Sequence, residues 1–309
     1  MTILPFVAVI IPVLNDAADL ELTLSALQQQ TYPQDRFEII VVDNGSTDRS
    51  VTVAQQFPNV RLLYEYRYKG SPYSARNRAL EATQSEVIAL LDATCVPVPA
   101  WLSEAVKAML QRKADLVGGN VAFRFASDRP SVAELYDAIA NVRMREAIWV
   151  RQVAMTANLF VKREVFDAIG PFPEGLRSGG DMRWTRRATR AGYKLVFCET
   201  ALVKKAARSH WALIKKQWRV GKGHPAIWAE AGQHTALSEI LRGLFMLPKP
   251  AAARNMLIQC APIDARGRFL QFWLLTCALR IVSQLSYLVG WLQLNRQSPK
   301  QNTTSLNDP

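Results

Sequence analysis

Glycine-rich phosphate-binding motifs are missing from this sequence. No GxGxxG follows the first apolar run and no GxxxxGK[ST] occurs, so neither a dinucleotide-binding motif nor a P-loop is supported. The four cysteines, Cys95, Cys198, Cys260 and Cys277, show no CxxC spacing, which argues against a zinc site or a disulfide framework and favours a reducing compartment. No local Ser/His/Asp or Cys/His signature is present, so the chemistry must come from another arrangement.

A basic segment is also missing in front of the first apolar run. Residues 1–14 contain no Lys or Arg, and Pro12 stands near the end of the run. A signal peptide normally begins with a positively charged region, so these residues do not fit one. We expect a buried strand there instead.

Acidic residues are scarce in the second part of the chain. The formal net charge is +12, made of −4 in residues 1–100 and +16 in residues 101–309. Between Arg183 and Lys222 stand 12 basic residues and one acidic residue, Glu199. Such a block favours a phosphate-bearing partner: a nucleotide, a nucleic acid or an anionic lipid.

Apolar runs alternate with helical patterns through the first 95 residues. We expect strands at residues 7–11, 37–42, 60–64 and 87–91, with helices at residues 20–30, 49–56 and 74–83 between them. This alternation predicts an α/β fold with a mostly parallel sheet flanked by helices. Asp43 and Asp92 each stand at the end of an apolar run. Because ligands bind at the carboxyl ends of parallel strands, we expect both carboxylates at a ligand site.

Several segments in order carry a family resemblance. They are VAVIIPVLND, EIIVVDNGSTD, GSPYSARNRAL, EVIALLDATCVPVPAWL and a later stretch that ends in Ala191-Gly192-Tyr193. Together they resemble the family-2 inverting glycosyltransferases with the GT-A fold, of the bacterial cell-envelope or exopolysaccharide type. The match runs from about Val7 to Gly223. It implies an enzyme that transfers a sugar from a nucleotide-diphosphate sugar to a hydroxyl acceptor, either lipid-linked or a saccharide.

The resemblance also implies roles for particular residues. The donor site would include Pro12, Asn15, Asp43, Arg76 and Asp92. Asp181 falls on the carboxylate that acts as the general base of a single displacement with inversion at the anomeric carbon. The leaving nucleoside diphosphate gains negative charge, which a cation or fixed dipoles must stabilise.

Two positions depart from the family pattern at the metal. Thr94 replaces the second Asp of the DxD motif, the residue that normally holds the divalent ion, so Asp92 is the remaining metal ligand there. Lys205 falls where the family often has a His. We hypothesise that Lys205, with Arg219 or Lys222, partly replaces the metal by neutralising the diphosphate. A bound Mg²⁺ or Mn²⁺ is the alternative.

Two further departures concern the acceptor. Gln217-Trp218-Arg219 has the residue types of the Gln-x-x-Arg-Trp motif of polymerising relatives but not its spacing, which favours transfer of a single sugar. We assign Gln217 and Arg219 to the donor site. Gly180 precedes Asp181 where the family usually has Glu, so one acceptor contact would be missing.

A long apolar segment stands at residues 269–294. It could cross a bilayer, but Arg280 and several polar residues interrupt it. We prefer a helix that lies on the inner face of the plasma membrane; a spanning helix, and a helix packed in a soluble protein or a dimer, are the alternatives. We therefore expect a glycosyltransferase domain at residues 1–235, a helical amphipathic segment at 236–296 and a disordered tail at 297–309.

Other functions compete with sugar transfer. A nucleotidyl- or sugar-phosphate transferase needs a glycine-rich loop with a Lys after the first strand, which PVLNDAADL does not provide. Binding of nucleic acid by residues 183–222 is a weaker alternative, because the acidic first part of the chain repels a phosphate backbone. Thr94 motivates a third reading, a catalytically inactive protein that binds nucleotide-sugars. The sequence leaves the sugar, the base, the acceptor and the oligomeric state open.

Overall fold

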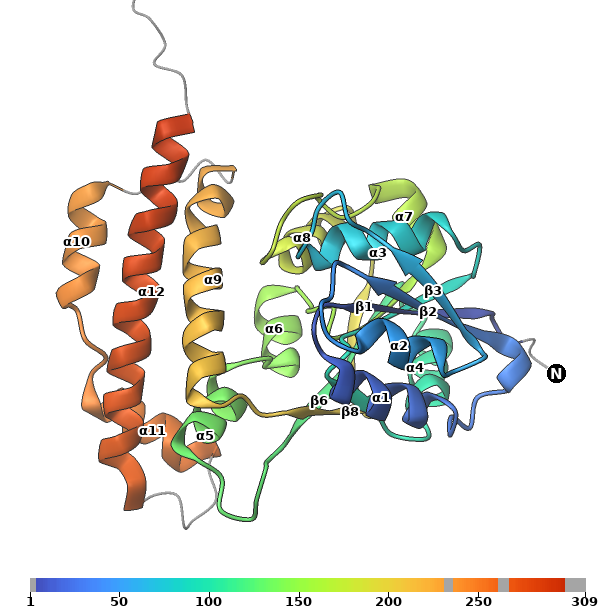
Figure 1. The fold of residues 1–309 in the computed structure, drawn as a ribbon, viewed down its shortest axis with the longest axis horizontal. Helices are drawn as coiled ribbons and strands as arrows, with labels where there is room; N and C mark the ends of the chain where they lie inside the picture. Colours follow the sequence, from blue (N-terminus) through green and yellow to red (C-terminus); the bar gives the residue numbers. More distant parts are fainter. Residues whose placement is uncertain (1–3, 231–235, 261–266, 298–309) are drawn as a thin grey trace, which may run out of the picture.

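The computed structural model describes residues 4–230, 236–260 and 267–297 (Figure 1). In these residues an eight-stranded sheet has the order β3-β2-β1-β4-β7-β6-β8-β5. The strands are β1 (Val7–Val13), β2 (Phe37–Asp43), β3 (Val60–Tyr64), β4 (Val87–Leu91), β5 (Cys95–Pro97), β6 (Leu116–Arg124), β7 (Asn158–Lys162) and β8 (Leu195–Ala206). The four strands predicted from apolar runs are therefore confirmed as β1 to β4.

Strand pairing explains where ligands can approach the sheet. β1 lies between β2 and β4 and is parallel to both, and β3 is parallel to β2. β7 runs antiparallel between β4 and β6, while β8 pairs parallel with β6 and antiparallel with the short β5. The sheet is mostly parallel and flanked by helices, so the predicted α/β fold is confirmed. β1, β2 and β4 end at one shared edge, where the polar residues that follow them gather.

Helices cover both faces of the sheet, which is why β1 is apolar without interruption. Successive side chains of a strand point to opposite faces. Val9 and Ile11 pack with one set of helices, and Ala8 and Ile10 pack with another. The first set is α1 (Ala17–Leu27), α2 (Ser50–Gln55) and α4 (Trp101–Gln111). The second is α3 (Pro72–Glu81), α6 (Met144–Arg151), α7 (Arg163–Ile169) and α8 (Gly180–Arg190).

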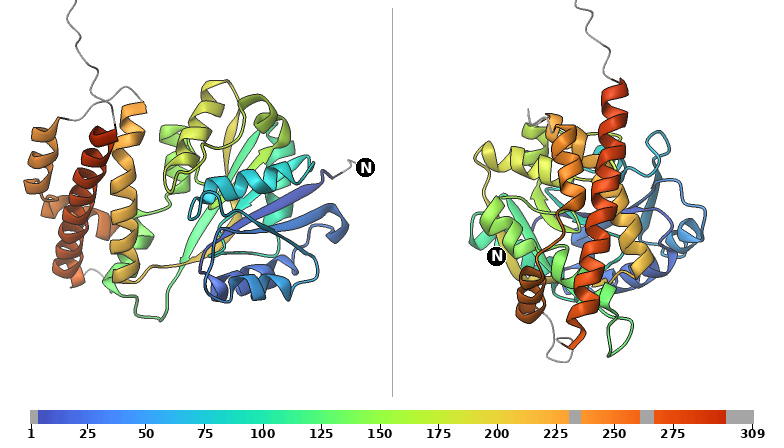
Figure 2. Two further views of the ribbon diagram at one scale, coloured as in Figure 1. Left: turned by 45° about the horizontal axis from the view of Figure 1, so that its top comes forward. Right: turned by 90° about the vertical axis from the view of Figure 1, so that its left-hand side faces the viewer.

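The remaining helices form a layer beside the sheet-containing part (Figures 1 and 2). They are α5 (Val132–Ala140), α9 (His210–Glu230), α10 (Leu237–Phe245), α11 (Pro250–Cys260) and α12 (Phe269–Gln297). α12 packs along α9 and also touches α5, α10 and α11. The layer also includes α9, which lies before residue 236, the predicted start of the C-terminal helical segment. The tail expected at 297–309 lies almost wholly outside the described residues.

Two glycines let α9 and α12 approach closely. A Cβ at Gly290 would lie 2.1 Å from the main-chain oxygen of Lys222. A Cβ at Gly221 would lie 2.0 Å from the hydroxyl of Ser286. Both distances are far below van der Waals contact, so only glycine fits, and the helices are held at a separation that small residues define. This packing supports α9, which contributes residues to the cavity described below.

Candidate active site

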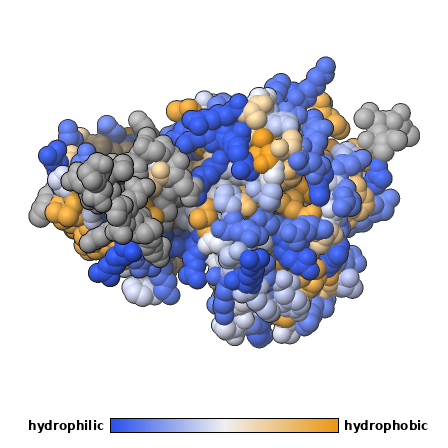
Figure 3. Space-filling model, turned by 90° about the horizontal axis from the view of Figure 1, so that it is seen from above, coloured by the Kyte–Doolittle hydropathy of each residue, from blue (hydrophilic) through white to orange (hydrophobic). Residues whose placement is uncertain are grey.

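A cavity of about 1500 Å³ opens at the shared edge of the parallel strands, between the sheet and α9. Hydrophilic residues predominate on the face seen from above, where the helical layer meets the rest of the molecule (Figure 3). The residues that line the cavity and bear on its chemistry are Pro12, Asp16, Tyr73, Arg76, Asp92, Thr94, Asp181, Arg183, Arg186, Arg187, Arg190, Lys205, Arg208, Lys216 and Arg219. Three carboxylates therefore face many cations, so the cavity suits an anionic ligand.

Asp181 lies in the first turn of α8 and faces this cavity. Its Oδ1 accepts hydrogen bonds from the hydroxyl of Tyr73 (3.1 Å) and the amide of Met182 (2.9 Å), and its Oδ2 accepts one from the amide of Thr156 (3.4 Å). Burial raises the pKa of Asp181, and the hydrogen bond from Met182 and the charge of Arg76 offset this only in part. A raised pKa makes the carboxylate a stronger base, as general base catalysis requires.

The N-cap of α8 is Gly179, in a left-handed conformation (φ 76°), and not Asp181. The carboxylate of Asp181 therefore does not act as the N-cap of this helix. At the next position, a Cβ on Gly180 would lie 2.9 Å from the ring of Tyr73. The ring of Tyr73 therefore lies beside residue 180, where a larger residue would collide with it. Glycine at this position permits the contact between Tyr73 and Asp181.

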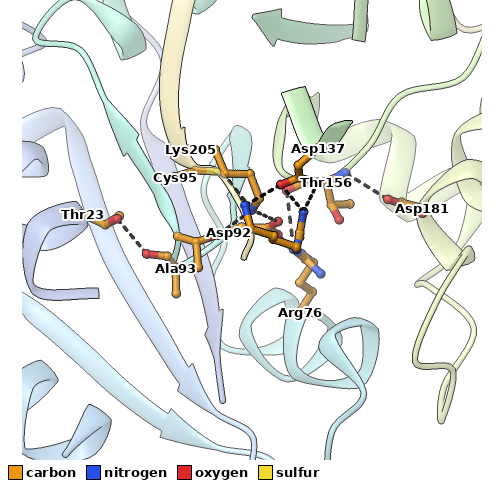
Figure 4. A network of polar contacts seen from close by, with 11 residues as sticks. Thr23, Arg76, Asp92, Ala93, Cys95, Asp137, Thr156, Asp181 and Lys205 are labelled. Carbon is orange, nitrogen blue, oxygen red and sulfur yellow. Dashed lines mark hydrogen bonds and ion pairs between the residues drawn. The ribbon is translucent and has the colours of Figure 1, made fainter. Parts of the chain in front are cut away.

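Asp92 follows β4 and is held between two cations (Figure 4). Arg76, only 1% exposed, donates from Nη2 to Oδ1 of Asp92 over 2.9 Å. Lys205, 3% exposed, donates from Nζ to Oδ2 of Asp92 over 3.2 Å. Burial favours a higher pKa for Asp92, but the charges of Lys205 and Arg76 outweigh it and hold the pKa well below its usual range. The three groups together carry one net positive charge.

Strand pairing and side-chain hydrogen bonds fix the loop that carries Asp92 and Thr94. Cys95 of β5 is paired with Lys205 of β8, so the residue before Cys95 lies beside the lysine side chain. The hydroxyl of Thr94 accepts a hydrogen bond from Nζ of Lys205 (2.5 Å). The carbonyl of Ala93 accepts one from the hydroxyl of Thr23 on α1 (2.8 Å) (Figure 4). The position of Lys205 is thus a consequence of strand pairing between segments 110 residues apart.

A second cationic group lies on the side of α9. Arg208 donates from Nη1 to Oδ1 of Asp137 (3.1 Å), a carboxylate with no exposed surface. Lys216 also lines the cavity; burial, followed by the nearby charge of Arg208, lowers its pKa to about 7. Arg219 completes this wall. These cations face the cavity from the segment that follows β8.

Arginines also line the cavity along α8. Arg183, Arg186, Arg187 and Arg190 are spaced by three and four residues, so they share one face of the helix, while Trp184 packs on the opposite face. Arg186 and Arg190 form no ion pair with any residue in the described part of the chain. No acidic residue follows Asp181 in α8. Arg186 and Arg190 are therefore available to an external anion.

Three residues assigned to the site from the sequence do not line the large cavity. Asp43 is 1% exposed, and its carboxylate accepts hydrogen bonds from the amides of Gly45 and Ser46. The side chain of Asn15 accepts one from the amide of Thr47 (2.7 Å) and borders a second, smaller hollow. Gln217 lies on α9, where its carbonyl accepts a hydrogen bond from Ser286. The other assigned residues are lining residues: Pro12, Arg76, Asp92, Asp181, Lys205 and Arg219.

Sequence reasoning did not single out some residues of the cavity. Tyr73 stands within GSPYSARNRAL, and Arg208 and Lys216 belong to the basic block, so a signal for each was present. No motif distinguished them from their neighbours, because only the fold shows which side chains face the cavity. Asp137 gave no signal at all, since it lies in a helix outside every motif.

An α/β fold with a buried carboxylate and a cation-lined cavity at the ends of its parallel strands is the class of protein that binds an anionic ligand at the strand ends. Comparison with known proteins makes this specific. The family model "Glycosyl transferase family 2" matches residues 8–170. Glycosyltransferase AglE of Haloferax volcanii is 44% identical over 229 residues, which are 73% of this chain and 75% of AglE. The chain therefore belongs to glycosyl transferase family 2, and it is a glycosyltransferase.

Solved structures agree with the fold. The mannosyltransferase PcManGT from Pyrobaculum calidifontis, in complex with GDP-Man and Mn²⁺, matches with a TM-score of 0.63 at 21% identity, over 93% of this chain and 88% of PcManGT. Residues 1–349 of S. aureus TarS, in complex with UDP-GlcNAc, match with a TM-score of 0.55 at 15% identity, over 94% and 92% of the two chains. These matches confirm the predicted GT-A fold. The readings as an inactive binding protein or a nucleic-acid-binding protein are not favoured.

Proposed function

We propose that this enzyme transfers one sugar from a nucleoside-diphosphate sugar to an acceptor hydroxyl with inversion, and that Asp181 is its general base. One observation carries the proposal. The carboxylate of Asp181 faces the same cavity as the cationic group formed by Arg76, Asp92 and Lys205. A base for the acceptor and cations for the leaving group are the two requirements of a single displacement.

In this proposal, Asp181 acts on the acceptor and the cationic residues act on the leaving group. The acceptor oxygen attacks the anomeric carbon of the donor, and the bond from that carbon to the diphosphate oxygen breaks. Asp181 takes the proton of the acceptor hydroxyl. The bonding electrons leave with the diphosphate, whose increased negative charge is stabilised by Arg76 and Lys205 at one side and by Arg208, Lys216 and Arg219 at the other. Burial of Arg76 and Lys205 strengthens their charge interactions relative to water.

The acceptor in this proposal carries a negative charge near its reacting hydroxyl. Arg183 to Arg190 span about 10 Å along α8, at 1.5 Å per residue, and begin next to Asp181. Arginine binds phosphate and carboxylate groups with paired, planar hydrogen bonds. A phosphate of a lipid-linked acceptor, or an acidic group of a saccharide, would therefore lie beside the accepting sugar. Arg186 and Arg190, which line the cavity without an ion pair in the described part of the chain, support this part of the proposal.

The helical layer supports a location at a membrane surface. α12 is long and apolar enough to cross a bilayer by length and composition, but one side of it packs on α9 and α5. Its exposed large apolar side chains recur at intervals of four and seven residues, so they form a single stripe: Leu270, Leu274, Ile281, Leu285 and Leu292. We propose that this stripe contacts the inner face of the plasma membrane. In this proposal residues 1–235 contain the transferase machinery and 236–296 the membrane-associating part.

The donor class is tested by binding and turnover together. Purified protein is screened by thermal shift against UDP-, GDP- and dTDP-linked sugars, because binding of the right donor raises the melting temperature through linkage.

The assignment of the base is tested by substitution. Asp181→Asn is compared with the wild type and with Asp167→Asn, which changes an exposed aspartate that pairs with Arg163 on α7. We expect Asp181→Asn to keep donor binding and to lose transfer by 100-fold or more, on the order of a lost general base. Unchanged transfer in this variant would contradict the assignment of the base.

A further inference from the structure

The residues around Asp92 do not fit the divalent metal site that the family pattern implies. A hard dication takes several oxygen ligands. Here Oδ1 of Asp92 binds Arg76 and Oδ2 binds Lys205, and the second position of the motif holds the neutral hydroxyl of Thr94. In the described parts of the chain, no group of three or more His, Cys, Asp or Glu side chains gathers that could hold a metal ion. A dication would therefore have to displace or face the ammonium group of Lys205.

The ammonium group of Lys205 is held in a fixed position by its neighbours. Its Nζ is within hydrogen-bonding distance of Asp92 (3.2 Å) and Thr94 (2.5 Å), and 3.6 Å from the sulfur of Cys95. These contacts leave the side chain 3% exposed at the cavity wall. A flexible lysine in solvent loses much rotamer freedom when it binds a phosphate, whereas a fixed one does not. Lys205 is thus preorganised.

The departures at positions 94 and 205 complement each other. Pairing of β5 with β8 puts the two residues side by side. An aspartate at position 94 would neutralise Lys205 and leave no net charge for a ligand. Threonine leaves the group of Arg76, Asp92 and Lys205 with one net positive charge. Because Thr94 accepts its hydrogen bond from Lys205, its own hydroxyl proton is free to be donated into the cavity.

Arg76 adds a second fixed cation to the cavity wall. Its side chain is 1% exposed and lines the cavity, and its Nη2 is held by Oδ1 of Asp92 over 2.9 Å. A guanidinium binds phosphate oxygens with planar hydrogen bonds. Arg76 is therefore placed to contact a diphosphate oxygen beside Lys205.

Resting on the proposed function, we propose that the ammonium group of Lys205, with Arg76 and the hydroxyl of Thr94, takes the place of the divalent cation and binds the donor diphosphate without metal. The charge that a metal would bring is supplied by the chain itself. The enzyme then needs no Mg²⁺ or Mn²⁺ to hold its donor. This distinguishes it from PcManGT, whose structure contains Mn²⁺ with GDP-Man.

The test measures binding of UDP and GDP by calorimetry, in EDTA and in Mn²⁺. For the wild type we expect dissociation constants that agree within about twofold in the two conditions. Binding that falls more than tenfold in EDTA and returns with Mn²⁺ would overturn the inference while leaving the proposed donor class intact. If neither nucleotide binds in any condition, and dTDP does not bind either, the proposed function itself fails. The wild-type comparison decides the question even where a variant does not fold.

Substitutions at positions 94 and 205 test the role of Lys205 directly. Lys205→Gln should weaken nucleotide binding at least tenfold, and Mn²⁺ should not restore it. Its matched control is Lys162→Gln, which breaks a Lys–Asp pair of 2.9 Å outside the cavity and should leave binding unchanged. The double variant Thr94→Asp/Lys205→His returns a carboxylate and an imidazole to these positions, so its nucleotide binding should become dependent on Mn²⁺. Unaltered binding by Lys205→Gln would contradict the role of the lysine. Thermal unfolding of each variant confirms that it is folded.

Discussion

The hydroxyl of Tyr73 donates a hydrogen bond to Oδ1 of Asp181 over 3.1 Å, from a helix 108 residues earlier in the chain. Burial raises the pKa of Tyr73, so its hydroxyl stays protonated and remains a donor. The bond stabilises the ionised form of Asp181 and orients its carboxylate. Tyr73 is therefore a positioning residue for the proposed base, and Gly180 provides the space for its ring.

Replacing Tyr73 by Phe should move the acid limb of the pH profile. Loss of a hydrogen bond to the carboxylate raises the pKa of Asp181 further above its ordinary value, so a higher pH is needed to ionise the base. A bond worth about 1 kcal/mol corresponds to a shift of about 0.7 pH unit. The measurement is kcat/KM against pH. Tyr32→Phe, whose hydroxyl contacts the carbonyl of Pro5 away from the cavity, is the control. An acid limb that stays in place would contradict this role.

Adding a methyl group at Gly180 should impair turnover more than donor binding. The new Cβ would lie 2.9 Å from the ring of Tyr73, so the ring must move and its bond to Asp181 is lost or lengthened. We expect Gly180→Ala to lower kcat about tenfold, since misplacement of a catalytic group by a fraction of an ångström is costly. Donor affinity, measured by calorimetry, should stay within about twofold. Gly223→Ala, also in a helix but with nothing closer than 4.0 Å, should have neither effect.

Removal of Arg76 should destabilise the fold as well as the site. Arg76→Gln leaves Asp92 with Lys205 alone and should reduce the free energy of unfolding by about 2 kcal/mol, less than a fully buried pair because Asp92 is partly exposed. Urea unfolding measures this. The pKa of Asp92 is lowered in the folded state, so its contribution is complete above the ordinary Asp range and is lost as the pH falls. Arg78→Gln, an exposed neighbour paired with Glu81, should change stability by less than about 0.5 kcal/mol.

Charge reversal on α8 should act on the acceptor and not on the donor. The double variant Arg186→Glu/Arg190→Glu should lower kcat/KM for a phosphate-bearing acceptor at least tenfold and leave the KM for the donor within about twofold. The reason is that these arginines line the cavity along α8, whereas the diphosphate cations lie on α3, β8, α9 and the segment that joins β8 to α9. A matched reversal, Arg78→Glu/Lys107→Glu, changes the net charge equally outside the cavity. Acceptor kinetics that are equal in the two double variants would contradict an anionic acceptor.

Polar substitutions in the exposed stripe of α12 should weaken membrane binding. Leu274→Ser/Leu285→Ser removes two side chains that are 53% and 42% exposed, and burying the exposed part of each in the bilayer boundary would contribute about 1 kcal/mol. Co-sedimentation with vesicles that contain anionic lipid should fall at least tenfold. Leu22→Ser/Leu110→Ser, both 46% exposed on the α/β part, is the control. If the stripe instead joins two copies of the chain, light scattering will show a wild-type dimer that the α12 variant loses.

The pattern of apolar residues correctly predicted β1 to β4 and the helices between them, in the first 95 residues. A strand buried on both faces needs an unbroken apolar run, as at residues 7–11, and this requirement is local. The ends were less accurate: the helix expected at 20–30 is α1, which begins at Ala17 and ends at Leu27. Helix ends depend on caps and on tertiary contacts, which no periodicity records.

Strand periodicity and motif order are properties of short segments, so the α/β class, the family and the residue types at the departures can be read from the amino-acid sequence alone. Which charges meet depends on how the elements fold together. Asp43 is the last residue of β2, and Asp92 directly follows β4. Asp43 is buried by contacts with its own turn, whereas Asp92 faces the cavity between Arg76 and Lys205. Tyr73 and Asp181 lie far apart in the chain and meet because α3 and α8 pack on the same face of the sheet. Contacts of this kind depend on the positions of whole elements, and those positions are set by packing.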